Sequence, residues 1–155
     1  MDKILAFLII LCTYQFVGAQ SNTFCLTDTT FAKGSVYTCP LFDFYNSCNN
    51  KYNRIQIDSI KNFLRPNKTI KIQISCHTDQ RRSAEYNKLL SEKYAKGIKE
   101  TLVDSTISTD RISTFGFGES KPIVDIKTIE AMKTTQEKEQ AYSKNRRIEI
   151  MIIDL

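Results

Sequence analysis

Two stretches of the chain alternate apolar and polar residues. Every second residue is apolar over residues 70–76, and the same period returns over residues 148–152. A two-residue period is typical of a strand with one buried face. We therefore expect a strand that runs into His77-Thr78-Asp79 and a closing strand over residues 147–153.

The residues after Asp79 change to a helical period. Apolar and aromatic side chains recur at every fourth position, which places them on one face of a helix over residues 83–103. This stripe consists of Tyr86, Leu90, Tyr94, Ile98 and Leu102. Two further helices are expected, one over residues 53–64 that ends before Pro66-Asn67, and a polar one over residues 129–143.

The remaining segments complete an alternation of strands and helices. We expect a strand over residues 111–117, after which Gly116 and Gly118 let the backbone turn sharply. One or two short strands, interrupted by Pro40, are expected over residues 35–45. This order predicts an α/β domain in which helices pack on a sheet. The end of a strand before a helix is where such folds expose polar groups to ligands, so the junction after Asp79 is the candidate site.

The first 19 residues differ from the rest of the 155-residue chain. Lys3 precedes an apolar run over residues 4–11, and Val17-Gly18-Ala19 offers small residues, a pattern that predicts a secretory signal peptide cleaved after Ala19. The run is too short to span a bilayer comfortably, and no other segment could. A retained N-terminal anchor is the alternative. Cys12 does not predict a lipoprotein, because Leu11 stands where a small residue is expected.

Cleavage would leave a mature chain in two parts. Residues 20–34 are polar and are expected to form a tether or loop pinned by Cys25, and residues 35–155 are expected to form one domain. We see no internal repeat, no second domain and no transmembrane segment in the mature chain. The expected location of such an exported protein is the periplasm or the periphery of the cell outer membrane.

An even set of cysteines remains after the expected cleavage: Cys25, Cys39, Cys48 and Cys76. In an exported chain such a set predicts disulfides. Three connectivities are possible, and the sequence does not choose among them. A zinc site is the weaker alternative, because no Cys-x-x-Cys spacing accompanies the single histidine, His77.

Composition and charge narrow the function. A hydrophobic content of 41% and a charged content of 25% are ordinary for a globular protein. The net charge of +5 favours anionic partners such as cell-wall polymers or lipid headgroups, and no nucleic-acid-binding motif is present. One histidine, without a Ser-His-Asp block, a phosphate loop or paired catalytic carboxylates, argues against an enzyme. No cofactor and no metal are expected.

Several ordered blocks carry a resemblance to a known family. His77-Thr78-Asp79 is followed by Tyr86-Asn87, Leu90-Ser91 and Ala95, then by Asp110-Arg111-Ile112-Ser113 and by residues 116–122 and 144–150. Upstream, Leu41-Phe42-Asp43-Phe44 resembles an opening strand. With these blocks, residues 35–155 resemble the OmpA-like peptidoglycan-binding family, of the outer-membrane protein A and peptidoglycan-associated lipoprotein type. The resemblance implies a single-domain, two-layer α/β sandwich with helices packed on one mixed β-sheet.

The resemblance also implies a ligand, the peptide stem of peptidoglycan and chiefly its diaminopimelate. An anion, a bidentate cation and oriented donors recognise the ammonium and carboxylates of this group. Asp79 matches the family's anion, and its alternative role is a carboxylate at the positive end of a helix dipole. Thr78 offers a hydroxyl or braces the turn. Asn87 is expected to be a ligand residue and Arg147 a secondary one, whereas Arg146 and His77 are expected to be structural.

Three positions depart from the family's pattern. Tyr94 stands where the family has its ligand-binding arginine, and losing such a charge-assisted pair costs roughly 1.5–3 kcal/mol. Tyr45 replaces an asparagine that often contacts the ligand, and Arg82 replaces a loop glycine. One hypothesis is that Arg82 supplies the guanidinium that is absent at position 94. The alternative is a loop arginine that points into water.

Two functions follow from these observations. The first is non-catalytic binding of the peptidoglycan stem peptide in the cell envelope, with outer-membrane proteins as further candidate partners. The alternative is a degenerate OmpA-like scaffold that has lost the ligand charge pair and serves as a protein-interaction module. Both functions depend on the residues around Asp79.

Overall fold

The computed structural model describes residues 23–40 and 51–155. Its elements, in chain order, are β1 (Val36–Pro40), α1 (Lys51–Leu64), β2 (Lys71–His77), α2 (Ala84–Leu102), the short 3-10 helix η1 (Thr109–Arg111), β3 (Ile112–Gly118), α3 (Ile126–Ala131), α4 (Thr135–Asn145) and β4 (Arg147–Asp154). The expected signal peptide, the opening-strand block at residues 41–44, Tyr45 and Cys48 lie outside the described residues.

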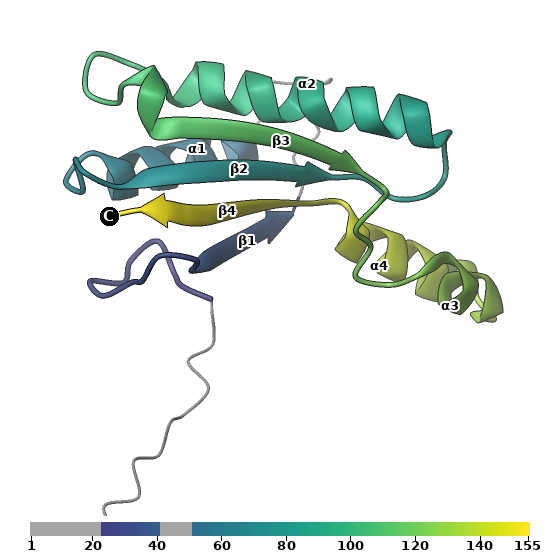
Figure 1. Ribbon diagram of the computed structural model, residues 1–155. Helices are drawn as coiled ribbons and strands as arrows, with labels where there is room; N and C mark the ends of the chain where they lie inside the picture. Colours follow the sequence, from purple (N-terminus) through teal and green to yellow (C-terminus); the bar gives the residue numbers. More distant parts are fainter. Residues whose placement is uncertain (1–22, 41–50) are drawn as a thin grey trace, which may run out of the picture.

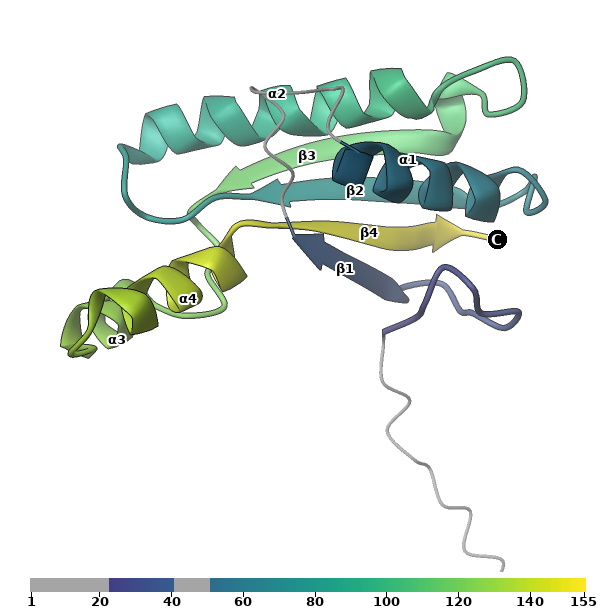
Figure 2. The same ribbon diagram turned by 180° about the vertical axis from the view of Figure 1, so that it is seen from behind.

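The strands of the described chain form one mixed sheet in the order β1-β4-β2-β3 (Figure 1). β2 and β3 are parallel, whereas β4 runs antiparallel to both β1 and β2. Helices α1 and α2 lie along the sheet, and α3 and α4 extend beyond the end where β2 and β3 finish (Figure 2). The predicted α/β sandwich, with helices packed on one mixed sheet, is confirmed.

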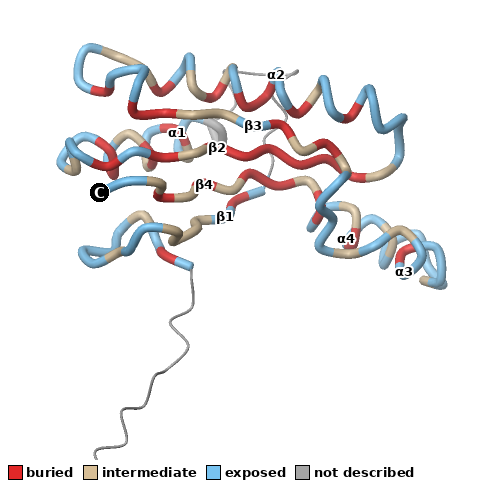
Figure 3. The backbone as a smooth tube through the Cα atoms, in the orientation of Figure 1, coloured by how far each residue is buried: buried red, intermediate tan, exposed pale blue. Residues whose placement is uncertain are grey.

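The alternation along β2 and β4 decides which side chains face the helices. Every second residue is an isoleucine that is 0% exposed: Ile72, Ile74, Ile148, Ile150 and Ile152. Burying such a side chain stabilises the fold by about 1.5–3 kcal/mol. Figure 3 shows that burial concentrates in the central strands and on the sheet-facing side of α2, while α3 and α4 are mostly exposed.

Helix α2 begins at a capping residue, and its start fixes the position of the loop that follows β2. Ser83 is its N-cap, and the Ser83 hydroxyl accepts a hydrogen bond from the Tyr86 N–H at 3.2 Å. A serine cap typically stabilises a helix by about 1 kcal/mol. Farther along, Ile98 and Leu102 are fully buried, as the four-residue period predicts.

The first turns of α2 depart from the predicted stripe. Leu90, expected in the core, is only half-buried, while Asn87 and Ser91 are buried in its place. The cause is a close approach of two backbones, because a Cβ at Gly116 would lie 2.2 Å from a backbone nitrogen of α2. Only small side chains fit between α2 and β3 at this level. The absence of a side chain at Gly116 therefore lets α2 and β3 pack closely. The backbone turn lies at Gly118, whose φ is +54°.

The segment before β1 packs onto the domain through aromatic side chains. Phe24 is 6% exposed, and its ring centroid lies 5.4 Å from that of Phe63 in α1 and 6.2 Å from that of Tyr37 in β1. Phe31 packs edge-on against Phe63 at 5.4 Å. Cys25, expected to pin this segment, is exposed and forms no disulfide with another described cysteine. Phe24 and Phe31 therefore anchor this segment.

The described cysteines, Cys25, Cys39 and Cys76, form no disulfide with one another. Cys39 and Cys76 both pair in register with Ile148, one from each side of β4. Two inter-strand spacings, about 10 Å, therefore separate them, which is beyond the reach of a disulfide. Burial raises the pKa of the Cys39 thiol to about 12 and that of Cys76 well above its ordinary value. Neither thiol is thereby prone to ionise near neutral pH.

The polar segment after β3 forms two helices instead of the single one expected over residues 129–143. α3 ends at Ala131, and α4 begins after Thr134. Thr134 and Glu137 form a capping box in which each side chain accepts a hydrogen bond from the other residue's backbone N–H. This start signal lies inside the predicted helix and divides it.

Candidate ligand-binding site

A cavity of about 550 Å³ opens where β2 ends and α2 begins. A cavity of this size accommodates a small molecule or one segment of a polymer. Its walls come from the loop between β2 and α2, the first turns of α2, and the residue that precedes β4. The lining residues are Thr78, Asp79, Arg81, Arg82, Asn87, Leu90, Tyr94 and Arg146. Most of the ligand residues expected from the sequence therefore lie around one cavity.

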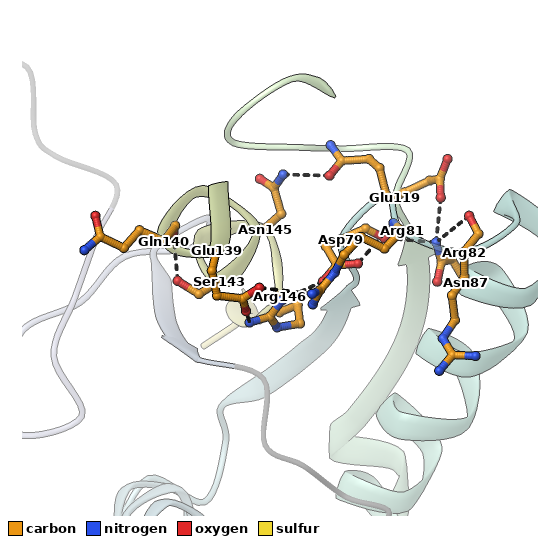
Figure 4. A network of polar contacts seen from close by, with 11 residues as sticks. Asp79, Arg81, Arg82, Asn87, Glu119, Glu139, Gln140, Ser143, Asn145 and Arg146 are labelled. Atoms are coloured by element: carbon orange, nitrogen blue, oxygen red, sulfur yellow. Dashed lines mark hydrogen bonds and ion pairs between the residues drawn. The ribbon is translucent and has the colours of Figure 1, made fainter. Parts of the chain in front are cut away.

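Asp79 is the centre of the polar network in this cavity (Figure 4). Its Oδ1 accepts a hydrogen bond from the Arg81 backbone N–H at 3.2 Å. Its Oδ2 accepts from Arg81 Nε and Nη2, at 3.0 and 2.7 Å, and from Arg146 Nη1 at 2.6 Å. Burial alone would raise the pKa of Asp79, but the hydrogen bonds from Arg81 and Arg146 outweigh burial and hold this pKa below its ordinary value.

Helix α4 closes the network from the other side of the cavity. Glu139 accepts hydrogen bonds from Arg81 Nη1 at 3.0 Å and from Arg146 Nη2 at 2.6 Å. The Arg81 guanidinium also lies over the ring of Tyr142, 4.9 Å from its centroid. The loop after β2 is thus tied to α4 by two guanidiniums, each shared between two carboxylates.

Arg81, Glu139 and Tyr142 are the site residues that sequence reasoning missed. Arg81 had one signal, its place in the Arg81-Arg82 doublet two residues after Asp79. Glu139 and Tyr142 had none, because they follow Asp79 by about sixty residues and reach it only through the packing of α4. Arg146 was expected to be structural, and the structure places it in the cavity wall.

Arg82 lies at the cavity but does not approach Asp79, so the hypothesis that it supplies the guanidinium absent at position 94 stays a prediction. It lines the cavity, but Figure 4 shows its side chain pointing away from Asp79. Its guanidinium stacks on the ring of Tyr86, with 4.8 Å between the guanidinium carbon and the ring centroid. No carboxylate in the described chain lies within ion-pair distance of it. Arg82 is therefore an oriented cation on the α2 side of the cavity.

Thr78 and Asn87 hold the loop in different ways. The Thr78 N–H donates to Gly118 O at 2.9 Å, whereas Thr78 Oγ1 is buried and has no hydrogen-bond partner in the described residues. Asn87 Nδ2 donates to Asp79 O at 2.9 Å and to Glu119 Oε2 at 2.5 Å. Asn87 thus shapes the loop, and the buried Thr78 hydroxyl has no hydrogen-bond partner among the described residues.

Arg147 does not line the cavity. Its Nε donates to Glu149 Oε1 at 2.8 Å, its Nη2 donates to Lys121 O at 3.1 Å, and its side chain is 8% exposed. These contacts brace the sheet, so the geometry does not place Arg147 among the ligand residues. Tyr94 is 8% exposed and forms part of the cavity wall with Leu90. Tyr45 lies outside the described residues.

His77 lies on the sheet face opposite α2 and beside the Arg147 contacts. Its Nε2 is 3.3 Å from Glu149 Oε2, and its ring stacks on Phe117 with centroids 5.2 Å apart. The contact of His77 and the hydrogen bond from Arg147 lower the pKa of Glu149 to about 2, against the opposing effect of burial. His77 is a structural residue, as expected, although its partner is a carboxylate and not the backbone.

Comparison with known proteins identifies the family. Residues 42–136 match the model of the OmpA family. This chain belongs to the OmpA family. The peptidoglycan-associated lipoprotein of Buchnera aphidicola is 34% identical over 133 residues, which cover 86% of this chain and 69% of that protein. The resemblance expected from the sequence blocks is therefore confirmed.

Two further relatives are matched over a smaller share of their length. The peptidoglycan-associated lipoprotein of Pasteurella multocida is 33% identical over 106 residues, covering 68% of this chain and 63% of that protein. Outer membrane porin F of Pseudomonas fluorescens is 27% identical over 111 residues, covering 72% of this chain and 31% of the porin. This chain thus spans less than two thirds of either protein.

Solved structures share the fold. The peptidoglycan-associated lipoprotein of Burkholderia pseudomallei superposes with a TM-score of 0.57 at 20% identity, covering 74% of this chain and 87% of that one. The periplasmic domain of Helicobacter pylori MotB superposes with a TM-score of 0.56 at 20% identity, covering 79% and 77%. At this identity the likeness concerns the arrangement of the sheet and helices alone.

The described residues show neither a membrane-spanning helix nor a cluster of metal ligands. Over residues 23–40 and 51–155, no helix is both long enough and apolar enough to cross a membrane. The same residues contain no group of three or more His, Cys, Asp or Glu side chains placed to hold a metal ion.

Proposed function

We propose that this protein binds peptidoglycan in the cell envelope, without catalysis, and that the stem peptide enters the cavity at the junction of β2 and α2. One observation carries the proposal: the OmpA-family motif residues Asp79, Thr78 and Asn87 converge on this cavity. Relatives that are named peptidoglycan-associated lipoproteins support the choice of ligand.

The chemistry of the cavity suits diaminopimelate in the stem peptide. This residue carries carboxylates and an ammonium on an aliphatic chain. The cavity offers guanidiniums, a buried hydroxyl at Thr78 and an apolar wall at Leu90 and Tyr94. Charged groups of both signs beside an apolar surface are what a short, zwitterionic side chain requires.

Export and location belong to the same proposal. Residues 1–19 serve as a signal peptide, and the mature protein resides in the periplasm or at the outer membrane, where its relatives include an outer membrane porin. N-terminal sequencing of protein recovered from the envelope fraction tests this part. A mature chain that starts at Gln20 supports it, and an intact Met1 contradicts it.

Sedimentation with purified sacculi at low ionic strength tests the binding function. We expect the mature protein to co-sediment and Asp79→Ala to weaken retention about tenfold, because the two guanidiniums lose the carboxylate that orients them. Asp154→Ala is the matched control. Its carboxylate pairs with Lys71 at 3.7 Å at the opposite end of β2 and is 56% exposed.

Two outcomes would contradict the proposal. Sacculi that fail to retain the wild-type protein would remove peptidoglycan as the ligand. Retention that is equal for wild type, Asp79→Ala and Asp154→Ala would show that binding occurs elsewhere, and would favour the degenerate, protein-binding scaffold over the proposed cavity.

A further inference from the structure

Resting on the proposed function, we propose that the cavity recognises a carboxylate of the stem peptide, that Arg82 contacts this carboxylate, and that Asp79 positions guanidiniums instead of contacting the ligand's ammonium. The cavity would thus select its ligand by negative charge. The proposal is carried by three features of the described residues: the partners of Asp79, the charges of the lining residues, and the buried Thr78 hydroxyl.

The first feature is that both oxygens of Asp79 already accept hydrogen bonds from the protein, and that the guanidiniums crowd Oδ2. Oδ2 already accepts hydrogen bonds from two guanidiniums, and Oδ1 accepts one from the backbone. An incoming ammonium would have to displace Arg81 or Arg146 from a charge-assisted hydrogen bond, which is among the stronger contacts in proteins. Arg81 and Arg146 would also repel that ammonium.

The second feature is the balance of charge on the lining residues. The charged side chains that line the cavity are the guanidiniums of Arg81, Arg82 and Arg146 and the carboxylate of Asp79. Arg81 and Arg146 bind Asp79 and Glu139, whereas Arg82 has no carboxylate partner in the described residues. The excess charge in the cavity is positive, and Arg82 carries it.

Arg82 is also held in a position that suits a carboxylate. Its guanidinium carbon lies over the Tyr86 ring, 4.8 Å from the centroid, and this cation–π contact restrains the group while its N–H donors remain for a ligand. An arginine held in this way loses less entropy on binding than a free one, and a planar guanidinium matches a carboxylate with two parallel hydrogen bonds.

The third feature is the hydroxyl of Thr78. Thr78 is 5% exposed, lines the cavity, and its Oγ1 has no hydrogen-bond partner within the described residues. A buried polar atom without a partner is costly in the free protein, so a ligand that supplies one is favoured. The Thr78 hydroxyl can donate to a carboxylate oxygen or accept from an ammonium. The positive excess of the cavity favours the carboxylate.

Synthetic stem peptides separate the two charges of the ligand. The parent is the tripeptide L-Ala-γ-D-Glu-meso-diaminopimelate. Replacing its third residue by 2-aminopimelate keeps the side-chain carboxylate and removes the ammonium, whereas replacing it by lysine keeps the ammonium and removes that carboxylate. A fourth peptide carries an amide at the C-terminal carboxyl. Titration calorimetry at low ionic strength measures the dissociation constant of each.

We expect the 2-aminopimelate peptide to bind within about threefold of the parent, and one carboxylate-deficient peptide, the lysine or the amide, to bind at least about tenfold more weakly. Whichever of the two loses affinity identifies the carboxylate that is recognised. Loss of tenfold or more for the 2-aminopimelate peptide, with the other two near the parent, would overturn the proposal.

Arg82→Gln tests the assignment of the contact. We expect the substitution to weaken binding of the parent peptide about tenfold. Binding of the peptide that lacks the recognised carboxylate should stay unchanged, because that peptide has no partner for Arg82. Arg65→Gln is the matched control, since Arg65 is an exposed arginine at the far end of α1 that pairs with Asp104. Arg82→Gln that weakens both peptides equally would overturn the assignment, and circular dichroism checks that both variants fold.

The outcomes distinguish this inference from the proposed function. Retention on sacculi without measurable binding of the parent peptide leaves peptidoglycan binding in place and overturns the carboxylate proposal. Absence of both sacculus retention and peptide binding overturns the two together.

Discussion

Two clusters of arginine and carboxylate start from adjacent arginines, and the two guanidiniums differ in burial. Arg146 is the C-cap of α4, has 31% of its side chain exposed, and reaches Asp79 at the cavity. Arg147 opens β4, is 8% exposed, and pairs with Glu149 on the sheet. In an extended backbone, successive side chains point to opposite sides, so two identical residues enter different environments.

This difference in burial suggests that the two arginines contribute differently, one to ligand binding and the other to the stability of the fold. An ion pair with an exposed guanidinium contributes about 0–1 kcal/mol to folding, whereas removing a buried guanidinium from its partner costs several kcal/mol. Asp79 has only 10% of its side chain exposed, but it keeps the guanidinium of Arg81 when Arg146 is removed, whereas Glu149 loses its guanidinium when Arg147 is removed. The cavity cluster around Asp79 is therefore expected to affect ligand binding more than stability, and the sheet cluster around Glu149 stability more than binding. Each prediction below tests one side of this contrast.

The largest effect is expected from Arg147→Ala, which should lower the free energy of unfolding by about 2–4 kcal/mol. The substitution leaves Glu149 without its guanidinium and Lys121 O without a donor. Urea unfolding at pH 7 measures the change. Peptide affinity under folding conditions should stay within about twofold, and a selective loss of affinity with unchanged stability would place Arg147 in the ligand site after all.

The second prediction concerns acid. The pKa of Glu149 falls from 4.5 to about 2 on folding, so its contribution to stability is fully present above pH 4.5 and is lost as the pH falls toward 2. We expect Glu149→Gln to lower stability at pH 7 by roughly 1–3 kcal/mol and to flatten the pH dependence of stability between those two values. Urea unfolding at pH 7, 4 and 3 measures it. Parallel profiles for variant and wild type would contradict this prediction.

The third prediction returns to the cavity. Arg146→Ala should weaken stem-peptide binding about three- to tenfold, because Asp79 and Glu139 lose one of their two guanidiniums and the positive excess of the cavity falls. It should lower stability by no more than about 1 kcal/mol. Titration calorimetry and urea unfolding, performed on the same variant, check both values. A stability loss as large as that of Arg147→Ala would remove the contrast between the neighbours.

The smallest expected effect is the change in the free energy of unfolding caused by Arg81→Gln. Its side chain is 47% exposed, as is that of Arg65, and each pairs with an aspartate. Both Arg81→Gln and Arg65→Gln should lower stability by about 1 kcal/mol or less, and only Arg81→Gln should change peptide affinity. Equal effects on affinity would show that net charge, and not the cavity, governs binding.

Much of the fold can be predicted from the sequence because buried residues recur with a fixed period along each strand and helix. The isoleucines of β2 and β4 and the second half of α2 are placed as predicted. Two errors have different physical causes. The first turns of α2 are displaced from the expected stripe by the approach of Gly116, and the capping box of Thr134 and Glu137 divides the expected last helix. The capping box could have been predicted from the sequence, whereas the displaced stripe depends on a contact between α2 and β3.

The site was predictable where its residues belong to one local motif. Asp79, Thr78 and Asn87 surround the cavity because they occupy a strand end and the helix that follows. Glu139 and Tyr142 were not predictable, because α4 brings them to Asp79 from a distant part of the chain. Which arginine of each doublet contacts Asp79 was likewise outside the reach of periodicity, since a loop and a helix cap have no repeating pattern.

By itself, the sequence determined the kind of elements, their order, the α/β class and the position of the polar junction after β2, because these follow from side-chain period and local caps. Only the tertiary structure decided that Arg81 and Arg146 hold the Asp79 carboxylate, that Arg82 remains without a carboxylate partner in the described residues, and that Arg147 is buried. The physical reason is that a guanidinium at the end of a long side chain takes its partner from whatever the packing of other segments places within reach.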